Sequence, residues 1–233
     1  FGESVKFLSS MMAIWDLNTK QAVHTINILN EESNNFRTTA TDLAAALMKT
    51  SAAAKAVGLS FEETTGLATT AIQSLGITGE AAGTMLTRVL ARMRSNKAAK
   101  EAIESLGIDA MAPMSDILNN LMVKWDQLTD GQKQNFAITV AGTHHWSKFL
   151  GVLENFDTVI QSTSKAYFSF NSAQNEGTFR AYQRNVNLNT EYHQWWTARD
   201  NRVRPDHIER QGEIVRVGDY FGNGLQFPGY RSH

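Results

Sequence analysis

The chain has 233 residues, a formal net charge of −1 and no cysteine. The near-neutral charge gives no reason to expect nucleic acid or an acidic membrane as a partner, and the lack of cysteine excludes disulfides, thiolate nucleophiles and cysteine-ligated zinc. No apolar run reaches the roughly 18–20 residues that a membrane-spanning helix needs, and no signal peptide is evident. The first residue is Phe1, which predicts a fragment or a processed product.

Apolar residues keep a helical spacing along most of the chain up to about Asn175. Two short sequences there match the pattern of a capping box, which begins a helix, at Thr39–Asp42 and at Ser60–Glu63. Further helices are predicted near residues 79–94, 96–106, 116–128, 131–141 and 144–165.

Three breaks between these helices share one pattern, in which glycine is followed by an apolar residue and then by Ser, Thr or Asp. A glycine after a helical run is typical of a left-handed C-cap, and the polar residue is a good N-cap for the next helix. The apolar residue between them can pack on both helices. The pattern predicts a bundle of short helices that turn sharply at Gly58-Leu59-Ser60, Gly76-Ile77-Thr78 and Gly107-Ile108-Asp109.

Two further features predict close packing. Gly79 and Gly83 lie four residues apart at the start of a helix, so they share one side of it, and small residues there let a neighbouring helix approach closely. Trp125 offers a large surface to a core of small side chains. None of these residues carries a reactive group, so they favour a structural role.

The composition changes from about Glu176, where lysine disappears, alanine becomes rare, and arginine and aromatic residues become frequent. A short strand is predicted at Glu213–Val217 and a turn at Gly222–Gly224. The predicted fold is therefore mainly α, with a bundle of short helices over residues 1–175 and a small α+β module over residues 176–233.

Because exposed linkers separate domains, we expect a protease to cut the native chain between about residues 170 and 190. Mass analysis of the fragments checks this. Resistance to cleavage in that segment would contradict the division into two modules.

An ordered set of short sequences runs from about Asn18 to Glu176. Its members are Leu29–Asn35, Thr41–Ala44, Ala53–Ser60, Gly79–Thr84, Ser105–Ile108, Leu118–Leu121, Lys124–Trp125, Val140–Thr143 with Gly142, Phe149–Leu150, Glu154–Phe156 and Ser172–Glu176. Through this set the chain resembles the core region of phage tail tape measure proteins. The residues expected to carry the structural motif are Gly58, Gly76, Gly79, Gly83, Gly107, Trp125 and Gly142.

This resemblance implies a structural role without enzymatic activity, cofactor, metal or small-molecule substrate. A tape measure protein lies inside the tail tube during assembly, its length sets the length of the tail, and it nucleates polymerisation of the tube. The implied partners are the phage tail tube protein, tail assembly chaperones and tail tip proteins. The implied location is the virion tail, after assembly in the host cytoplasm. An α-helix rises about 1.5 Å per residue, but this segment has many breaks, which favours a compact module attached to a longer rod.

The last part of the chain resembles a different family. The sequences Trp196–His207 and Phe221–Gly229 are similar to the C-terminal signature of the phage Mu F-like head-morphogenesis, or minor capsid, family. Members often carry cysteines after this point, and this chain has none. The alternative function is therefore head morphogenesis. A prophage mosaic, a fusion after deletion and an assembly artefact all remain open as origins of such a combination.

Four groups of residues allow a sharper interpretation as well as a plainer one. A metal site at His144-His145 is disfavoured, because adjacent helical residues point about 100° apart. Asp200, Asp206 and His207 have acid–base potential, but a network that fixes a loop is favoured. Nucleic-acid binding by the arginine-rich tail is disfavoured, because its acidic residues nearly cancel the arginines. Several methionines could form an adaptable docking surface, but a place in the hydrophobic core is favoured for them. They are Met85, Met93, Met111, Met114 and Met122.

Overall fold

The computed structural model describes residues 2–169, 192–194 and 214–216. The chain divides into two compact units, residues 1–170 and residues 171–233, which are described separately. Most of the segment 176–233, including the turn predicted at Gly222–Gly224, lies outside the described residues.

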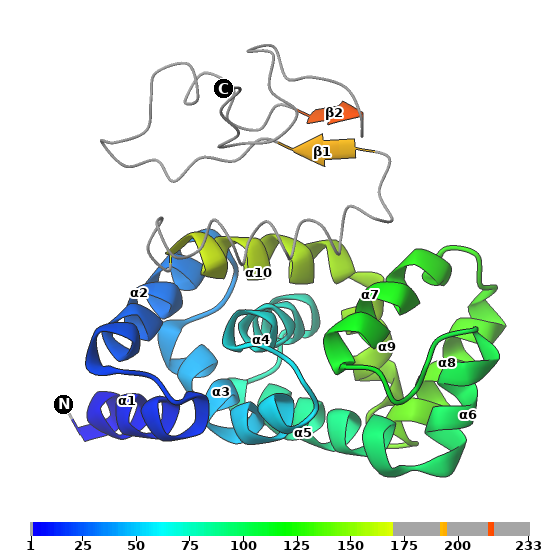
Figure 1. The fold of residues 1–233 in the computed structure, drawn as a ribbon, viewed down its shortest axis with the longest axis horizontal. Helices are drawn as coiled ribbons and strands as arrows, with labels where there is room; N and C mark the ends of the chain where they lie inside the picture. Colours follow the sequence, from blue (N-terminus) through cyan, green and yellow to red (C-terminus); the bar gives the residue numbers. More distant parts are fainter. Residues whose placement is uncertain (1, 170–191, 195–213, 217–233) are drawn as a thin grey trace, which may run out of the picture. The chain divides into compact units, whose positions relative to one another are not determined.

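Helices make up the described part of the first unit, which confirms the prediction of a mainly α fold there (Figure 1). None of them is long and apolar enough to cross a membrane. They are α1 (Gly2–Trp15), α2 (Thr19–Asn35), α3 (Ala40–Ala56), α4 (Phe61–Leu75), α5 (Gly79–Ser95), α6 (Lys97–Ser105), α7 (Met114–Trp125), α8 (Asp130–Ala141), α9 (Trp146–Glu154) and α10 (Phe156–Ser169).

One predicted helix is wrong. The segment 144–165 was expected to be continuous, but it divides into α9 and α10 at Asn155. The Asn155 side-chain amide donates to the Gly151 carbonyl at 2.8 Å, a local bond that competes with continuation of the helix. The start is also later than predicted, because Gly142–His145 forms a turn in which the Gly142 carbonyl accepts from the backbone N–H groups of His145 and Trp146.

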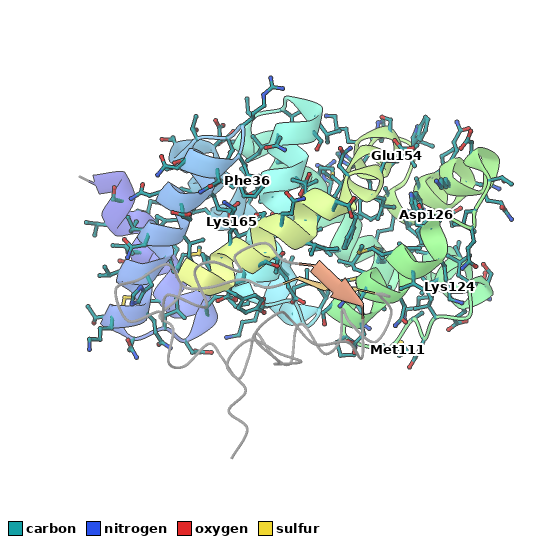
Figure 2. All side chains as sticks on the ribbon, turned by 90° about the horizontal axis from the view of Figure 1, so that it is seen from above. Phe36, Met111, Lys124, Asp126, Glu154 and Lys165 are labelled. Atoms are coloured by element: carbon teal, nitrogen blue, oxygen red, sulfur yellow. The ribbon has the colours of Figure 1, made fainter. Side chains whose placement is uncertain are left out.

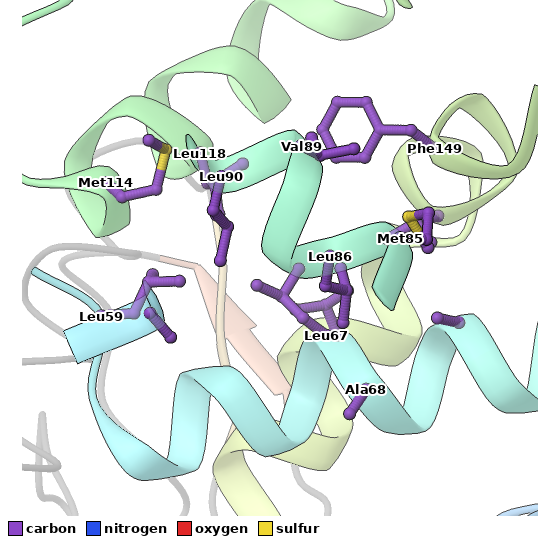
Figure 3. Packing of buried hydrophobic residues seen from close by; sticks show 14 of the residues in the cluster. Leu59, Leu67, Ala68, Met85, Leu86, Val89, Leu90, Met114, Leu118 and Phe149 are labelled. Atoms are coloured by element: carbon purple, nitrogen blue, oxygen red, sulfur yellow. The ribbon is translucent and has the colours of Figure 1, made fainter. Parts of the chain in front are cut away.

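The α4 helix lies at the centre of the first unit and contacts α3, α5, α9 and α10 (Figure 1). Its residues from Thr64 to Ile72 are all buried. In the core, Leu67 of α4 faces Leu86 of α5, and Leu90 lies near Leu118 of α7 (Figure 3). A helix buried on every side must be either apolar or internally hydrogen-bonded. In α4 the buried hydroxyls of Thr64, Thr65 and Thr70 are hydrogen-bonded within the chain, because each donates to the carbonyl four residues earlier.

Most of the five methionines singled out in the sequence belong to the core or pack against it. Met85, Met93 and Met114 are fully buried, as the plainer interpretation expected, and Met122 is half-buried. Met111 departs from that expectation, because it lies in the loop before α7 with 64% of its surface exposed.

The described residues of the second unit form one antiparallel pair of strands, β1 (Tyr192–Gln194) and β2 (Ile214–Arg216). Tyr192 pairs with Arg216, His193 with Val215 and Gln194 with Ile214. The β2 strand lies within Glu213–Val217, where a strand was predicted.

Candidate functional site

The glycines of the three helix breaks have positive φ angles, which other residues adopt at a cost. The values are 89° at Gly58, 60° at Gly76 and 70° at Gly107. The next residue in each break is apolar and packs into or against the core: Leu59 and Ile108 are buried, and Ile77 is partly buried. Each break therefore ends a helix and returns an apolar side chain to the core. At the third break the predicted N-cap at Asp109 is wrong, because a loop follows and α7 begins only at Met114, after Pro113.

The Gly58 break has the complete hydrogen-bond pattern of a Schellman motif. The Leu59 N–H donates to the Ala54 carbonyl at 3.0 Å, and the Gly58 N–H donates to the Lys55 carbonyl at 3.1 Å. Ser60 then begins α4 with a reciprocal capping box, in which its hydroxyl and the Glu63 side chain each accept from the other residue's backbone N–H. At Gly76 a single bond, from its N–H to the Ile72 carbonyl at 3.0 Å, ends α4.

We expect Gly58→Val to lower the free energy of unfolding by about 2 kcal/mol and Gly107→Val by about 1 kcal/mol, measured by urea denaturation. A Cβ at Gly58 would lie 3.3 Å from the Pro113 Cβ, whereas a Cβ at Gly107 would meet only the end of the Lys124 side chain, at 3.7 Å. Unfolding curves that coincide with that of the wild type would be inconsistent with the positive φ angles.

Gly79 and Gly83 lie on the side of α5 that packs against α3. A Cβ at Gly79 would lie 1.8 Å from the carbonyl oxygen of Asp42, and a Cβ at Gly83 would lie 2.7 Å from that of Ala46. Because Gly79 faces Asp42 and Gly83 faces Ala46, the two helices run parallel. Contact between the two backbones is possible only because the glycines have no side chain.

Polar groups fix the register of this helix pair. The Asp42 carboxylate accepts from the Gly79 backbone N–H at 2.9 Å and from the Thr39 hydroxyl at 2.8 Å. One turn further along α5, the Gly83 carbonyl accepts from the buried Thr50 hydroxyl of α3 at 3.0 Å. Asp42 therefore links the beginnings of α3 and α5, and both charge and hydrogen bonding suit a carboxylate at a helix N-terminus.

Trp125 and Gly142 occupy the part of the unit built from α5 to α9. Trp125 is buried and meets Phe136 of α8 edge to face, with ring centroids 6.0 Å apart, while the Lys133 ammonium lies over its ring at 5.6 Å. Gly142 ends α8 with φ 76° and ψ 166°, outside the left-handed helical region, and its N–H donates to the Ile138 carbonyl. Both residues stabilise the packing of α7, α8 and α9 rather than form a reactive centre.

Arg94, near the end of α5, was missed by the sequence analysis. Its guanidinium donates to the Val57 carbonyl at the end of α3, at 3.2 Å, and to three carbonyls of the loop before α7. The loop acceptors are Ala110 at 3.3 Å, Met111 at 3.1 Å and Ala112 at 2.8 Å. One side chain thus holds the loop and the Gly58 break together, which suits the planar donor fork of arginine.

Glu32 is a second residue that the sequence did not reveal. It is fully buried where α2, α4 and α10 meet. Its Oε2 atom accepts from the Thr69 hydroxyl at 2.9 Å and from the Ser162 hydroxyl at 2.5 Å, whereas Oε1 has no hydrogen-bond partner among the described residues. Burial raises the pKa of Glu32 to about 7.

The remaining predicted residues do not form a chemical centre that the structure describes. His144 is exposed, and burial, followed by the charges of Arg88 and Lys148, lowers the pKa of His145. Within the described ranges no group of three or more His, Asp or Glu side chains is placed to hold a metal ion. Asp200, Asp206 and His207 lie outside the described residues, as does most of the arginine-rich tail.

Taken together, these features describe a mainly helical unit whose distinctive residues hold helices together. The sequence model of the phage-related minor tail proteins matches residues 1–142, and the chain belongs to this family. It is also 26% identical, over 158 residues, to a tape measure protein of Pneumococcus phage Dp-1. That alignment covers 65% of this chain but only 14% of the relative. No solved structure matches the chain significantly.

Proposed function

We propose that this chain is part of a tail tape measure protein, the scaffold around which a phage tail tube polymerises and whose length sets the length of the tail. The observation that carries the proposal is the similarity to the tape measure protein of Pneumococcus phage Dp-1, joined to membership of the phage-related minor tail proteins. The relevant partners are tail tube subunits, tail assembly chaperones and tail tip proteins. The location is the virion tail, after assembly in the host cytoplasm.

In this role the first unit is a compact module, and a longer helical part of the protein supplies the length. The breaks at Gly58, Gly76 and Gly107 turn the chain back on itself, so its helices do not add up to a single rod. The contact of α5 with α3 at Gly79 keeps the module compact. We propose no catalytic step and no cofactor.

A phage that encodes this protein provides the test, by electron microscopy of particles made with Gly79→Ala. We expect complete heads without tails, because the variant disrupts the module. Gly131→Ala is the matched control, since a Cβ at Gly131 meets nothing within 4 Å, and it should give normal tails.

Normal tails with Gly79→Ala would contradict the proposal. Defective heads would instead favour the alternative of head morphogenesis, which rests on the resemblance of residues 176–233 to the Mu F-like family. The family match ends at residue 142 and does not reach that segment.

A further inference from the structure

The last helix of the first unit, α10, is held by polar contacts to distant parts of the chain. Its Ser162 hydroxyl donates to the buried carboxyl group of Glu32 on α2, and its Tyr167 hydroxyl donates to the Ser60 hydroxyl at 3.0 Å. At the edge of the contact, Lys165 lies beside Phe36, with its ammonium 5.8 Å from the ring centroid (Figure 2). Docking of α10 therefore depends on hydrogen bonds as well as on apolar packing.

The approach of α10 to α4 is unusually close. A Cβ at Gly66 of α4 would lie 2.1 Å from the Thr163 hydroxyl and 2.7 Å from the Val159 carbonyl oxygen. Thr163 is buried, and its hydroxyl oxygen has no hydrogen-bond partner among the described residues. Glu32, which bonds to the neighbouring Ser162, is itself fully buried, so a charge that forms on its carboxyl group is removed from bulk water.

The groups around Glu32 act on its charge in opposite directions. Burial disfavours the carboxylate and is the largest influence on its pKa, which is about 7. The hydroxyls of Ser162 and Thr69 and the charge of Lys165 favour the carboxylate, while Glu31 on the same helix disfavours it. Among the described residues, no charged group of α1, α3 or α4 acts appreciably on it. Desolvation therefore outweighs the favourable contacts.

We propose that α10 is a latch, docked most tightly on α2 and α4 while the carboxyl group of Glu32 is neutral and released more often when that group becomes a carboxylate. The geometry supports this, because Oε2 of Glu32 joins all three helices, whereas Oε1 is buried without a hydrogen-bond partner among the described residues. A negative charge on this carboxyl group would therefore leave one of its oxygens without a donor. Opening would uncover the side of α4 that carries Gly66 and Thr69. The inference does not depend on the proposed function.

The direction of the effect follows from proton linkage. With α10 released, Glu32 is solvated and has its ordinary pKa of 4.5, whereas with α10 docked its pKa is about 7. The docked state holds the proton more tightly, so docking is strongest below pH 4.5 and weakens as the pH rises. Between about pH 6 and about pH 8.5 the equilibrium constant for docking of α10 should fall about tenfold.

Hydrogen–deuterium exchange on the full chain, corrected for the intrinsic effect of pH, tests the latch. Over that pH range we expect the protection of amides in α10 to fall about tenfold, while amides in α5 keep theirs. Glu32→Gln, which keeps the shape and removes the titration, should abolish the change. Glu31→Gln is the matched control on the exposed neighbour and should leave the change in place.

Three results would overturn the latch: constant protection of α10 in the wild type, a uniform loss across α5 and α10, or an unchanged pH dependence in Glu32→Gln. If Glu32→Gln does not fold, the comparison of α10 with α5 in the wild-type chain decides alone. Exchange reports docking without any virion, so its failure is distinct from a failure of the proposed tail function.

Discussion

Gly79→Ala is expected to lower the free energy of unfolding by about 3 kcal/mol, at the upper end of what overpacking usually costs. The added Cβ would lie 1.8 Å from the carbonyl oxygen of Asp42 and 2.5 Å from its carbonyl carbon. These are backbone atoms of α3, so no side-chain rotation relieves the clash. The helices must separate, which breaks the bonds from Gly79 to Asp42 and from Thr50 to Gly83.

Urea denaturation followed by circular dichroism measures this loss, and Gly131→Ala provides the matched control. Gly131 is a helical glycine in α8 with open space around it. Its replacement should leave stability unchanged or raise it by up to about 1 kcal/mol, because alanine is the better helix former. Equal midpoints for Gly79→Ala and Gly131→Ala would show that α3 and α5 do not approach as closely as described.

Arg94→Met is expected to lower the free energy of unfolding by about 3 kcal/mol. The substitution keeps much of the apolar stem and leaves the carbonyls of Val57, Ala110, Met111 and Ala112 without the guanidinium donor. A hydrogen bond to a charged group contributes about 1.5–3 kcal/mol, and partial exposure of the loop limits the sum. Thermal unfolding measures the effect.

Two further variants separate the hydrogen bonds of Arg94 from its charge. Arg94→Lys keeps the charge but has no planar fork to span Val57 and Ala112, so it should recover only part of the loss. Arg88→Met removes an exposed arginine from the same helix and should change stability by less than about 0.5 kcal/mol. The assignment of Arg94 would be wrong if Arg94→Met were as harmless as Arg88→Met.

The helix ends were predictable because their signals are local. A capping box needs residues only three apart, and a glycine after a helical run needs only its neighbours. This is why the ends at Ser60 and Gly76 could be expected from the sequence. The continuous helix expected over residues 144–165 shows where the same reasoning fails, because Asn155 is tolerated within helices and its bond to Gly151 is visible only in the structure.

The long-range contacts were not predictable in the same way. Glu32 and Ser162 are 130 residues apart, and nothing near Glu32 distinguishes it from Glu31. Arg94 reaches carbonyls of two separate segments, and backbone acceptors carry no sequence signature. Gly66 did offer a signal, since a glycine within a helix costs about 1 kcal/mol and therefore calls for a packing reason. That reason is the contact with α10.

The assignment to the phage tail is best tested on purified virions of a phage that encodes this protein, by mass spectrometry of separated heads and tails. The proposed function predicts peptides from residues 40–110 in the tail fraction. Their presence only in heads would contradict it and transfer the function to head morphogenesis. Their absence from both fractions would contradict any role in the finished virion.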